Sequence, residues 1–156
     1  MKAPAATGLW LFKTEPDVFS IDDLKAKKKT VWDGVRNYTC RNYMRDLAKV
    51  GDTVFFYHSS CPEPGIAGLA TISKAGFPDP SAFDKKHAYF DPKSDPLAPR
   101  WYSVEVSFKA KAKELIPLPW LREHAQALPI FKLNRLSITP VDLPTGKRLL
   151  ALAGHW

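Results

Sequence analysis

A short segment around one glycine, from Trp32 to Tyr38, carries the residue types that could bind a nucleobase and its phosphates. The ring of Trp32 offers a flat face on which a base can stack, and Arg36 can bind a phosphate. Asp33 and Asn37 can exchange hydrogen bonds with the polar edge of a base. The same pattern is also typical of a strand, a turn and an amphipathic helix whose aromatic residues belong to the core. This segment alone leaves both interpretations open.

Further candidate ligands lie at the ends of two predicted strands. Tyr57, His58 and Ser59 end a β-branched and aromatic run, and loops that follow strands commonly carry binding groups. A single histidine at a strand end also fits a structural role. Arg100 and Trp101 stand at the start of the most regular alternation in the chain, with Trp101 on its polar face. We therefore include these five residues among the candidates.

Other kinds of site are weakly indicated. A serine or cysteine next to His58 does not make a catalytic triad, because adjacency in sequence does not place three groups together in space. Histidines and cysteines are scattered without the paired spacing of metal ligands, and no glycine-rich phosphate loop is present. We expect no catalytic residue, no metal and no cofactor. Two alternatives stay open: a base- or nucleoside-modifying enzyme that uses Glu15 or Asp33 as general acid or base, and a basic module that binds RNA or a ribosomal partner through its surface alone.

Composition favours one domain that binds nucleic acid. The chain has 156 residues, of which 45% are hydrophobic, and its formal net charge is +7. Cys40 and Cys61 are too few for a disulfide framework, so a reducing cytoplasm fits best. No secretion signal and no apolar stretch of roughly 20 residues is visible, so we expect no membrane partner. We expect a monomer with a short flexible N-terminus, residues 1–8, and a single domain over residues 9–156.

The hydrophobic pattern predicts short strands with helices between them. Strands are expected at 9–12, 31–32, 53–58, 66–73, 101–108 and 135–139, and helices after Ser20, after Asn37, at 119–128 and around 149–152. Residues 76–100 are rich in Pro, Asp and Ser and predict an irregular excursion that could act as a rim or lid. Together these elements predict an α+β fold: a small mixed β-barrel with helices packed outside it.

Several motifs, in order, resemble the EVE domain family. The similar segments are Trp10–Pro16, Ser20–Leu24, Trp32–Tyr38, Phe56–Ser59, Pro78–Pro80, Tyr89–Pro92, Pro99–Tyr102 and Arg135–Val141. The likeness therefore covers roughly residues 9 to 141. One departure is Thr39–Cys40, which stands where the family often has Gln-Ala, so the base preference of this chain can differ from that of its relatives.

The resemblance implies a PUA-like fold, a bent mixed β-barrel with flanking helices. It also implies a non-catalytic protein, in the cytosol of a bacterium, that recognises a modified base in DNA or RNA, notably a modified cytosine such as 5-methylcytosine. Trp32, Tyr57, His58, Ser59 and Trp101 would lie near the pocket. The complete set of expected base- and nucleic-acid-binding residues is Lys13, Thr14, Glu15, Trp32, Asp33, Gly34, Val35, Arg36, Asn37, Tyr57, His58, Ser59, Arg100 and Trp101.

Overall fold

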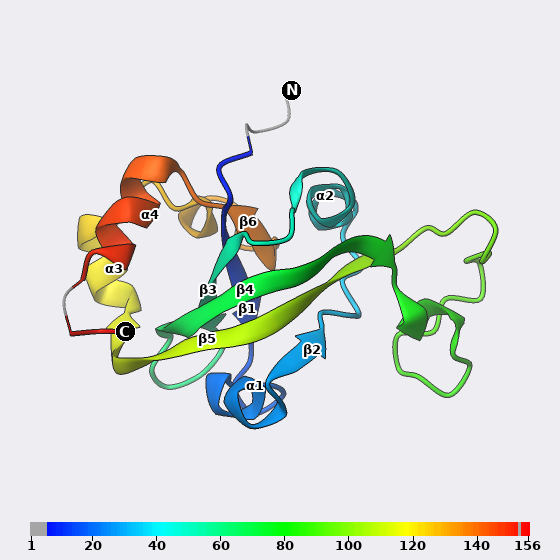
Figure 1. Ribbon diagram of the computed structural model, residues 1–156, viewed down its shortest axis with the longest axis horizontal. Helices are drawn as coiled ribbons and strands as arrows, with labels where there is room; N and C mark the ends of the chain where they lie inside the picture. Colours follow the sequence, from blue (N-terminus) through cyan, green and yellow to red (C-terminus); the bar gives the residue numbers. More distant parts are fainter. Residues whose placement is uncertain (1–5, 153) are drawn as a thin grey trace.

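The computed structural model describes residues 6–152 and 154–156, and its centre is a mixed sheet (Figure 1). The six strands are β1 (Leu9–Thr14), β2 (Lys29–Val31), β3 (Thr53–His58), β4 (Gly65–Pro78), β5 (Tyr102–Pro117) and β6 (Ile138–Pro140). The α-helices are α1 (Ile21–Lys27), α2 (Tyr38–Asn42), α3 (Leu118–His124) and α4 (Leu143–Leu150). Shorter helical turns follow at Tyr43–Leu47, Pro80–Phe83 and Pro129–Phe131. The predicted α+β class is confirmed.

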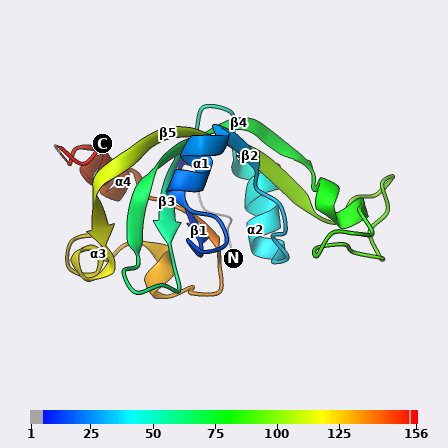
Figure 2. The same cartoon turned by 90° about the horizontal axis from the view of Figure 1, so that it is seen from below.

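Strand β1 is buried on both faces of the sheet, which explains its uninterrupted apolar run. Trp10 and Phe12 belong to one hydrophobic cluster, while Leu9 and Leu11 belong to another. Helices α1 and α2 cover the first cluster, and α3 and α4 cover the second, so helices lie on both faces of the curved sheet (Figure 2). The C-terminal residues of β1 therefore lie where the strand leaves the core, between the two hydrophobic clusters.

The two predicted helix starts are confirmed by their caps. Ser20 accepts a hydrogen bond from the backbone N–H of Asp23, whose side chain accepts one from the backbone N–H of Ser20. Asn37 Oδ1 accepts from the backbone N–H of Cys40 at 3.0 Å. The second helix continues as a π-helical turn that buries Met44. Asn37 is therefore held at the N-terminus of α2 by its own cap.

The predicted mixed β-barrel is not supported, because the sheet is open. Its strand order is β2-β5-β4-β3-β1-β6, which leaves β2 and β6 as edges that do not pair with each other. Both edge strands have only three residues. The rings of Phe12 on β1 and Trp32 after β2 lie 5.2 Å apart. The sheet therefore curls without closing, and an unpaired seam remains between its edges.

Strands β4 and β5 are longer than the sequence pattern predicts. They pair antiparallel as far as Pro78 and Tyr102, with register shifts along the way. The predicted irregular excursion is therefore shorter than expected and extends from the far end of this strand pair, on the right of Figure 1.

The described part of the predicted N-terminal segment is hydrogen-bonded to the domain. Thr7 Oγ1 donates to the carbonyl of Val141 at 2.6 Å, and the backbone N–H of Thr53 donates to the carbonyl of Gly8 at 2.9 Å. Residues 1–5 of that segment lie outside the described residues. Over residues 6–152 and 154–156, every helix is too short or too polar to cross a membrane.

Candidate functional site

A cavity of about 650 Å³ opens at the unpaired seam of the sheet. Its walls come from the end of β1, the segment before α1, β2 with the turn that follows it, and the segment before β6. The lining residues are Lys13, Thr14, Val18, Phe19, Thr30, Val31, Trp32, Asp33, Gly34, Val35, Arg36, Asn37, Tyr89, Arg135 and Ser137. Eight residues of the expected set therefore line one cavity: Lys13, Thr14 and the whole run from Trp32 to Asn37. These eight residues come together at the gap between the unpaired edge strands β2 and β6.

Trp32 forms the inner wall of this cavity. Its side chain is only 9% exposed, and its ring lies 5.2 Å from Phe12, 5.7 Å from Phe56 and 6.4 Å from Phe19. These contacts fix the orientation of the indole, which is therefore preorganised to receive a flat ligand. Trp32 thus belongs to the core and to the cavity wall at once, and its role in stacking on a base stays a prediction.

Asp79 holds the Gly34 turn in place from the irregular segment. Its side chain is fully buried and accepts hydrogen bonds from the backbone N–H of Gly34 at 2.9 Å and from Arg36 Nη1 at 2.9 Å. The hydroxyl and backbone N–H of Ser81 donate to its other oxygen. Burial raises the pKa of Asp79, but these hydrogen bonds outweigh it, so the pKa lies below its usual range. Asp79 is not among the binding residues expected from the sequence.

Arg36 is committed to this internal network. Besides Asp79, it donates to the carbonyl of Tyr89 at 2.6 Å and lies over the rings of Tyr89 and Trp101. Its guanidinium therefore anchors the irregular segment and has little capacity left for a phosphate, the role that its residue type suggests. Arg36 is a positioning residue in this structure.

Gly34 and Tyr89 meet at the rim of the cavity. Gly34 has φ +76°, and a Cβ added to it would lie 2.3 Å from the ring of Tyr89. Glycine is required here both by the left-handed backbone and by the close approach of that ring. Tyr89 is 44% exposed and lines the cavity, so one residue of the predicted excursion contributes to its rim.

Three polar side chains of the cavity keep free hydrogen-bonding groups. Burial, followed by the charge of Asp79, raises the pKa of Asp33, and His87 Nε2 lies 3.6 Å from its carboxylate. Asn37 uses its oxygen as a helix cap, so its amide N–H groups can donate. Lys13 Nζ donates to the carbonyl of Asn134 at 2.8 Å, which uses one of its three donors. Burial lowers the pKa of Lys13.

Three further expected residues lie beside the cavity. Glu15 and Ser59 line an adjacent cavity of about 340 Å³, which also shares Lys13. Tyr57 lines a separate cavity with Ser59 and Lys13. All three therefore lie near the same end of the β1–β3 pair, where these parallel strands stop.

His58, Arg100 and Trp101 lie away from the cavity lining. His58 Nε2 accepts a hydrogen bond from the backbone N–H of Ile21 at 3.1 Å, and burial lowers the pKa of His58. Trp101 is buried, stacks on Tyr38 at 4.8 Å and donates from Nε1 to Asp91 at 2.8 Å. Arg100 pairs with the same aspartate. These contacts are structural, and a ligand role for the three residues stays a prediction.

Seven residues that line the cavity were not expected from the sequence. They are Val18, Phe19, Thr30, Val31, Tyr89, Arg135 and Ser137. A signal existed for Phe19, which directly precedes the capping box, a position where an apolar residue packs against its helix. Arg135 and Ser137 lie in the motif before β6, which the sequence treats only as a strand. The departure at Thr39–Cys40 lies outside the cavity lining: both residues belong to α2, where Thr39 is exposed and Cys40 is buried.

The described part of the chain does not meet the requirements of a metal site. Within it, no three His, Cys, Asp or Glu side chains come together in a way that could hold a metal ion. Cys40 and Cys61 are both free thiols.

Comparison with known proteins gives consistent matches over nearly the whole chain. The model of the EVE domain matches residues 8–152. Thymocyte nuclear protein 1 of Homo sapiens is 43% identical over 153 residues, which is 85% of this chain and 68% of that protein. A protein from Pseudomonas syringae has a crystal structure with 44% identity and a TM-score of 0.85, covering 92% of this chain and 98% of that one. The human THYN1 protein, in complex with DNA that contains 5-methylcytosine, has 42% identity and a TM-score of 0.86, covering 92% of this chain and 96% of that one.

Proposed function

Because the chain belongs to the EVE domain family, we propose that it is a non-catalytic nucleic-acid-binding protein that recognises a modified base, with a modified cytosine as the preferred class. The base is taken from DNA or RNA into the cavity at the seam of the sheet. The observation that carries this proposal is the make-up of that cavity: an aromatic wall, a carboxylate and an amide beside it, and cations at its mouth. The complex of a relative with 5-methylcytosine DNA supports the choice of ligand.

The inner part of the cavity suits a pyrimidine. Its volume of about 650 Å³ is within the usual range for small-ligand sites. Trp32 and Phe19 provide apolar surface for the ring. The Asp33 carboxylate can accept from the exocyclic amine of cytosine, and the Asn37 amide can donate to a ring nitrogen or carbonyl. These two groups together favour cytosine over thymine, which has no exocyclic amine.

The outer part of the cavity suits the phosphates that flank the base. Lys13 retains donors beyond its bond to Asn134. Arg135 is exposed at the mouth and makes no hydrogen bond or ion pair with any residue that the structure describes. Such a cation can bind a phosphate without breaking an internal contact. Arg135 therefore takes the role that the sequence suggested for Arg36.

The energies favour unpaired nucleotides. Stacking on an aromatic side chain contributes roughly 1–3 kcal/mol per base, while extruding a base from a duplex costs a few kcal/mol. Burial of one methyl group adds only about 0.8 kcal/mol, a few-fold in affinity. Strong preference for a modified base therefore requires a polar modification or a cavity that penalises the unmodified base.

The proposal is tested by filling the cavity. Ser137→Phe places an aromatic ring where the base would lie, while Ser107→Phe makes the same change on β5 outside the cavity lining. Binding is measured by fluorescence anisotropy with single-stranded oligonucleotides that carry cytosine or 5-methylcytosine. We expect the Ser137 variant to lose at least about tenfold in affinity, since it forfeits the stacking term, and the Ser107 variant to bind as wild type does.

Two results would contradict this function. Equal binding by the Ser137 and Ser107 variants would mean that the nucleic acid is held by the basic surface alone. A product of changed mass after incubation with the modified oligonucleotide would mean that the protein is an enzyme acting on the base.

A further inference from the structure

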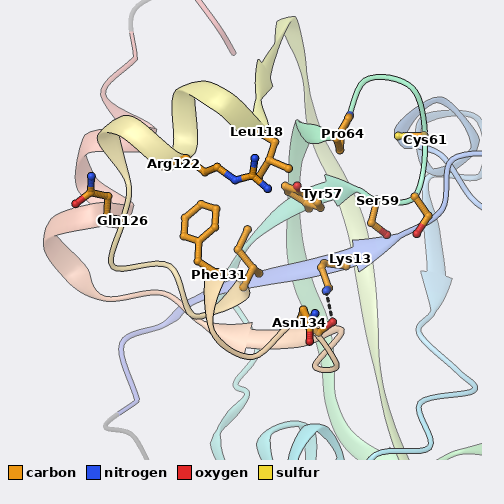
Figure 3. Close-up of a pocket in the computed structure, with 12 residues that line it drawn as sticks. Lys13, Tyr57, Ser59, Cys61, Pro64, Leu118, Arg122, Gln126, Phe131 and Asn134 are labelled. Atoms are coloured by element: carbon orange, nitrogen blue, oxygen red, sulfur yellow. Dashed lines mark hydrogen bonds between the residues drawn. The ribbon is translucent and has the colours of Figure 1, made fainter.

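A second cavity, of about 670 Å³, also has Lys13 in its lining (Figure 3). It is lined by Lys13, Tyr57, Ser59, Ser60, Cys61, Pro64, Leu118, Arg122, Gln126, Ile130, Phe131 and Asn134. Most of these residues belong to loops and to α3, and the proposed base-binding cavity shares only Lys13 with them. The base-binding role therefore leaves this cavity unexplained.

The charge of the second cavity favours an anion. Its lining contains Lys13 and Arg122 and, among the residues that the structure describes, no acidic side chain. Arg122 forms no ion pair within this described set, and Figure 3 shows its guanidinium directed toward Tyr57. Burial raises the pKa of Tyr57, while the nearby charge of Arg122 lowers it, which agrees with that closeness. Two cations without acidic partners line one pocket.

The walls of this cavity are fixed by backbone hydrogen bonds. The N–H of Ser59 donates to the carbonyl of Thr14 at 2.9 Å, which ties the loop after β3 to β1. The N–H of Leu118 donates to the carbonyl of Pro64 at 2.9 Å, which ties α3 to the same loop. Ile130 is buried in the cluster beneath the pocket, and Phe131 packs against that cluster. The cavity is thus a preorganised feature of the fold.

Lys13 connects the two cavities. It lines both of them. A smaller cavity of about 340 Å³ shares Lys13, Ser59 and Asn134 with the second cavity. The same small cavity shares six lining residues with the proposed base-binding cavity: Lys13, Thr14, Val18, Tyr89, Arg135 and Ser137. In the sheet, Lys13 pairs with Tyr57 across the parallel strands β1 and β3. A strand of nucleic acid can therefore pass from one cavity to the other across the ends of these two strands.

We propose that the second cavity binds the nucleotide next to the captured base, so that the protein recognises a dinucleotide step; this inference rests on the proposed function. Lys13 holds the phosphate that joins the two nucleotides, Arg122 holds the following phosphate, and the neighbouring base stacks on Phe131. Tyr57 and Gln126 offer polar groups to the edge of that base.

The experiment uses a pentanucleotide with one central 5-methylcytosine. In two companion oligonucleotides, the neighbour on one side or the other is replaced by an abasic residue, which keeps the phosphates and removes the base. We expect one of the two replacements to weaken binding by about fivefold or more, the lower end of one stacking contact. The conservative variant Phe131→Leu, which keeps apolar volume but loses the aromatic face, should abolish most of that difference.

The phosphate contact is measured separately through salt dependence. Arg122→Gln should lower the slope of log affinity against log salt by about one, because one phosphate contact is lost. Arg148→Gln on α4 makes the same change of net charge outside the cavity and should leave the slope unchanged. Equal slopes for the two variants would contradict the assignment of Arg122.

The outcomes separate this proposal from the one on which it rests. If Ser137→Phe abolishes binding while neither abasic replacement has an effect, the base cavity stands and the second site is wrong. If Ser137→Phe leaves binding unchanged, the proposed function itself fails. A loss with either abasic residue that persists in Phe131→Leu would place the neighbouring base elsewhere and would also overturn the second site.

Discussion

Asp33 lines the proposed base-binding cavity, and its surroundings raise the pKa of its carboxyl group. Burial and the neighbouring charge of Asp79 raise its pKa, and the imidazole Nε2 of His87 lies 3.6 Å from its carboxylate. An ionised Asp33 is therefore held in surroundings that do not favour its charge. Such a carboxylate gains from a donor such as the amine of cytosine.

The substitution Asp33→Asn should separate stability from binding. Because the pKa of Asp33 is raised in the folded state, its contribution to stability is present at low pH and is lost as pH rises through that pKa. We therefore expect the variant to unfold at a slightly higher temperature than wild type at neutral pH. The gain should vanish below the ordinary pKa of 3.8, where both states hold the proton.

The same variant should bind cytosine-containing ligands less tightly. A carboxylate that accepts from the exocyclic amine contributes about 1–3 kcal/mol of discrimination, so we expect roughly a tenfold loss or more. Thermal unfolding and fluorescence anisotropy measure the two effects on one protein sample. A variant that binds as wild type does would remove Asp33 from base recognition.

At the scale of elements, the segment after β4 depends on one buried carboxylate. Asp79 accepts from Gly34, Arg36 and Ser81 and so links this segment to the turn that forms the cavity wall. Asp79→Asn keeps the size of the side chain but replaces an acceptor with a donor. We expect a loss of about 3 kcal/mol in the free energy of unfolding, measured in urea.

A matched control for this prediction lies in the same segment. Asp84→Asn alters an exposed carboxylate that accepts a hydrogen bond from the backbone N–H of Lys86, and it should lower the free energy of unfolding by less than about 1 kcal/mol.

Because the folded-state pKa of Asp79 is lowered, its stabilising contribution is present above pH 3.8 and is lost as pH falls through that lowered pKa. Similar costs for the two variants would contradict the anchoring role of Asp79.

Helix α1 starts on a neutral histidine. His58 Nε2 accepts from the backbone N–H of Ile21, and burial lowers the pKa of His58, with Asp22 and Lys111 acting in opposite directions. The unfolded chain takes up this proton near 6.5, before the folded protein does. Stability from this contact is therefore present above that pH and is lost as pH falls through the lower folded-state pKa.

The variant His58→Gln keeps an acceptor for Ile21 but cannot titrate in this range. We expect its urea midpoint to change less than that of wild type between about pH 7 and about pH 5. Identical pH profiles for the two proteins would show that His58 is not the titrating contact.

For the whole molecule, local signals in the sequence predicted the helix starts and the buried strand, but they did not predict that the sheet stays open. Caps at Ser20 and Asn37 and the apolar run of β1 are determined by neighbouring residues, so they could be predicted. Whether β2 and β6 pair depends on how far the sheet curls, which no local pattern encodes. The lining of the candidate cavity divides in the same way: Trp32 and Asp33 were expected from a local motif, whereas Tyr89 reaches the cavity only because a distant segment folds back onto Gly34.

The proposed function is tested most directly by locating the bound base in the complex. An oligonucleotide with an isotope-labelled methyl group on 5-methylcytosine is bound to the protein, and nuclear Overhauser effects from that methyl group are recorded. We expect effects to the protons of Trp32 and Phe19, which form the apolar wall of the proposed base-binding cavity. Effects only to residues outside that cavity, or a methyl group with the signals of free oligonucleotide, would contradict it.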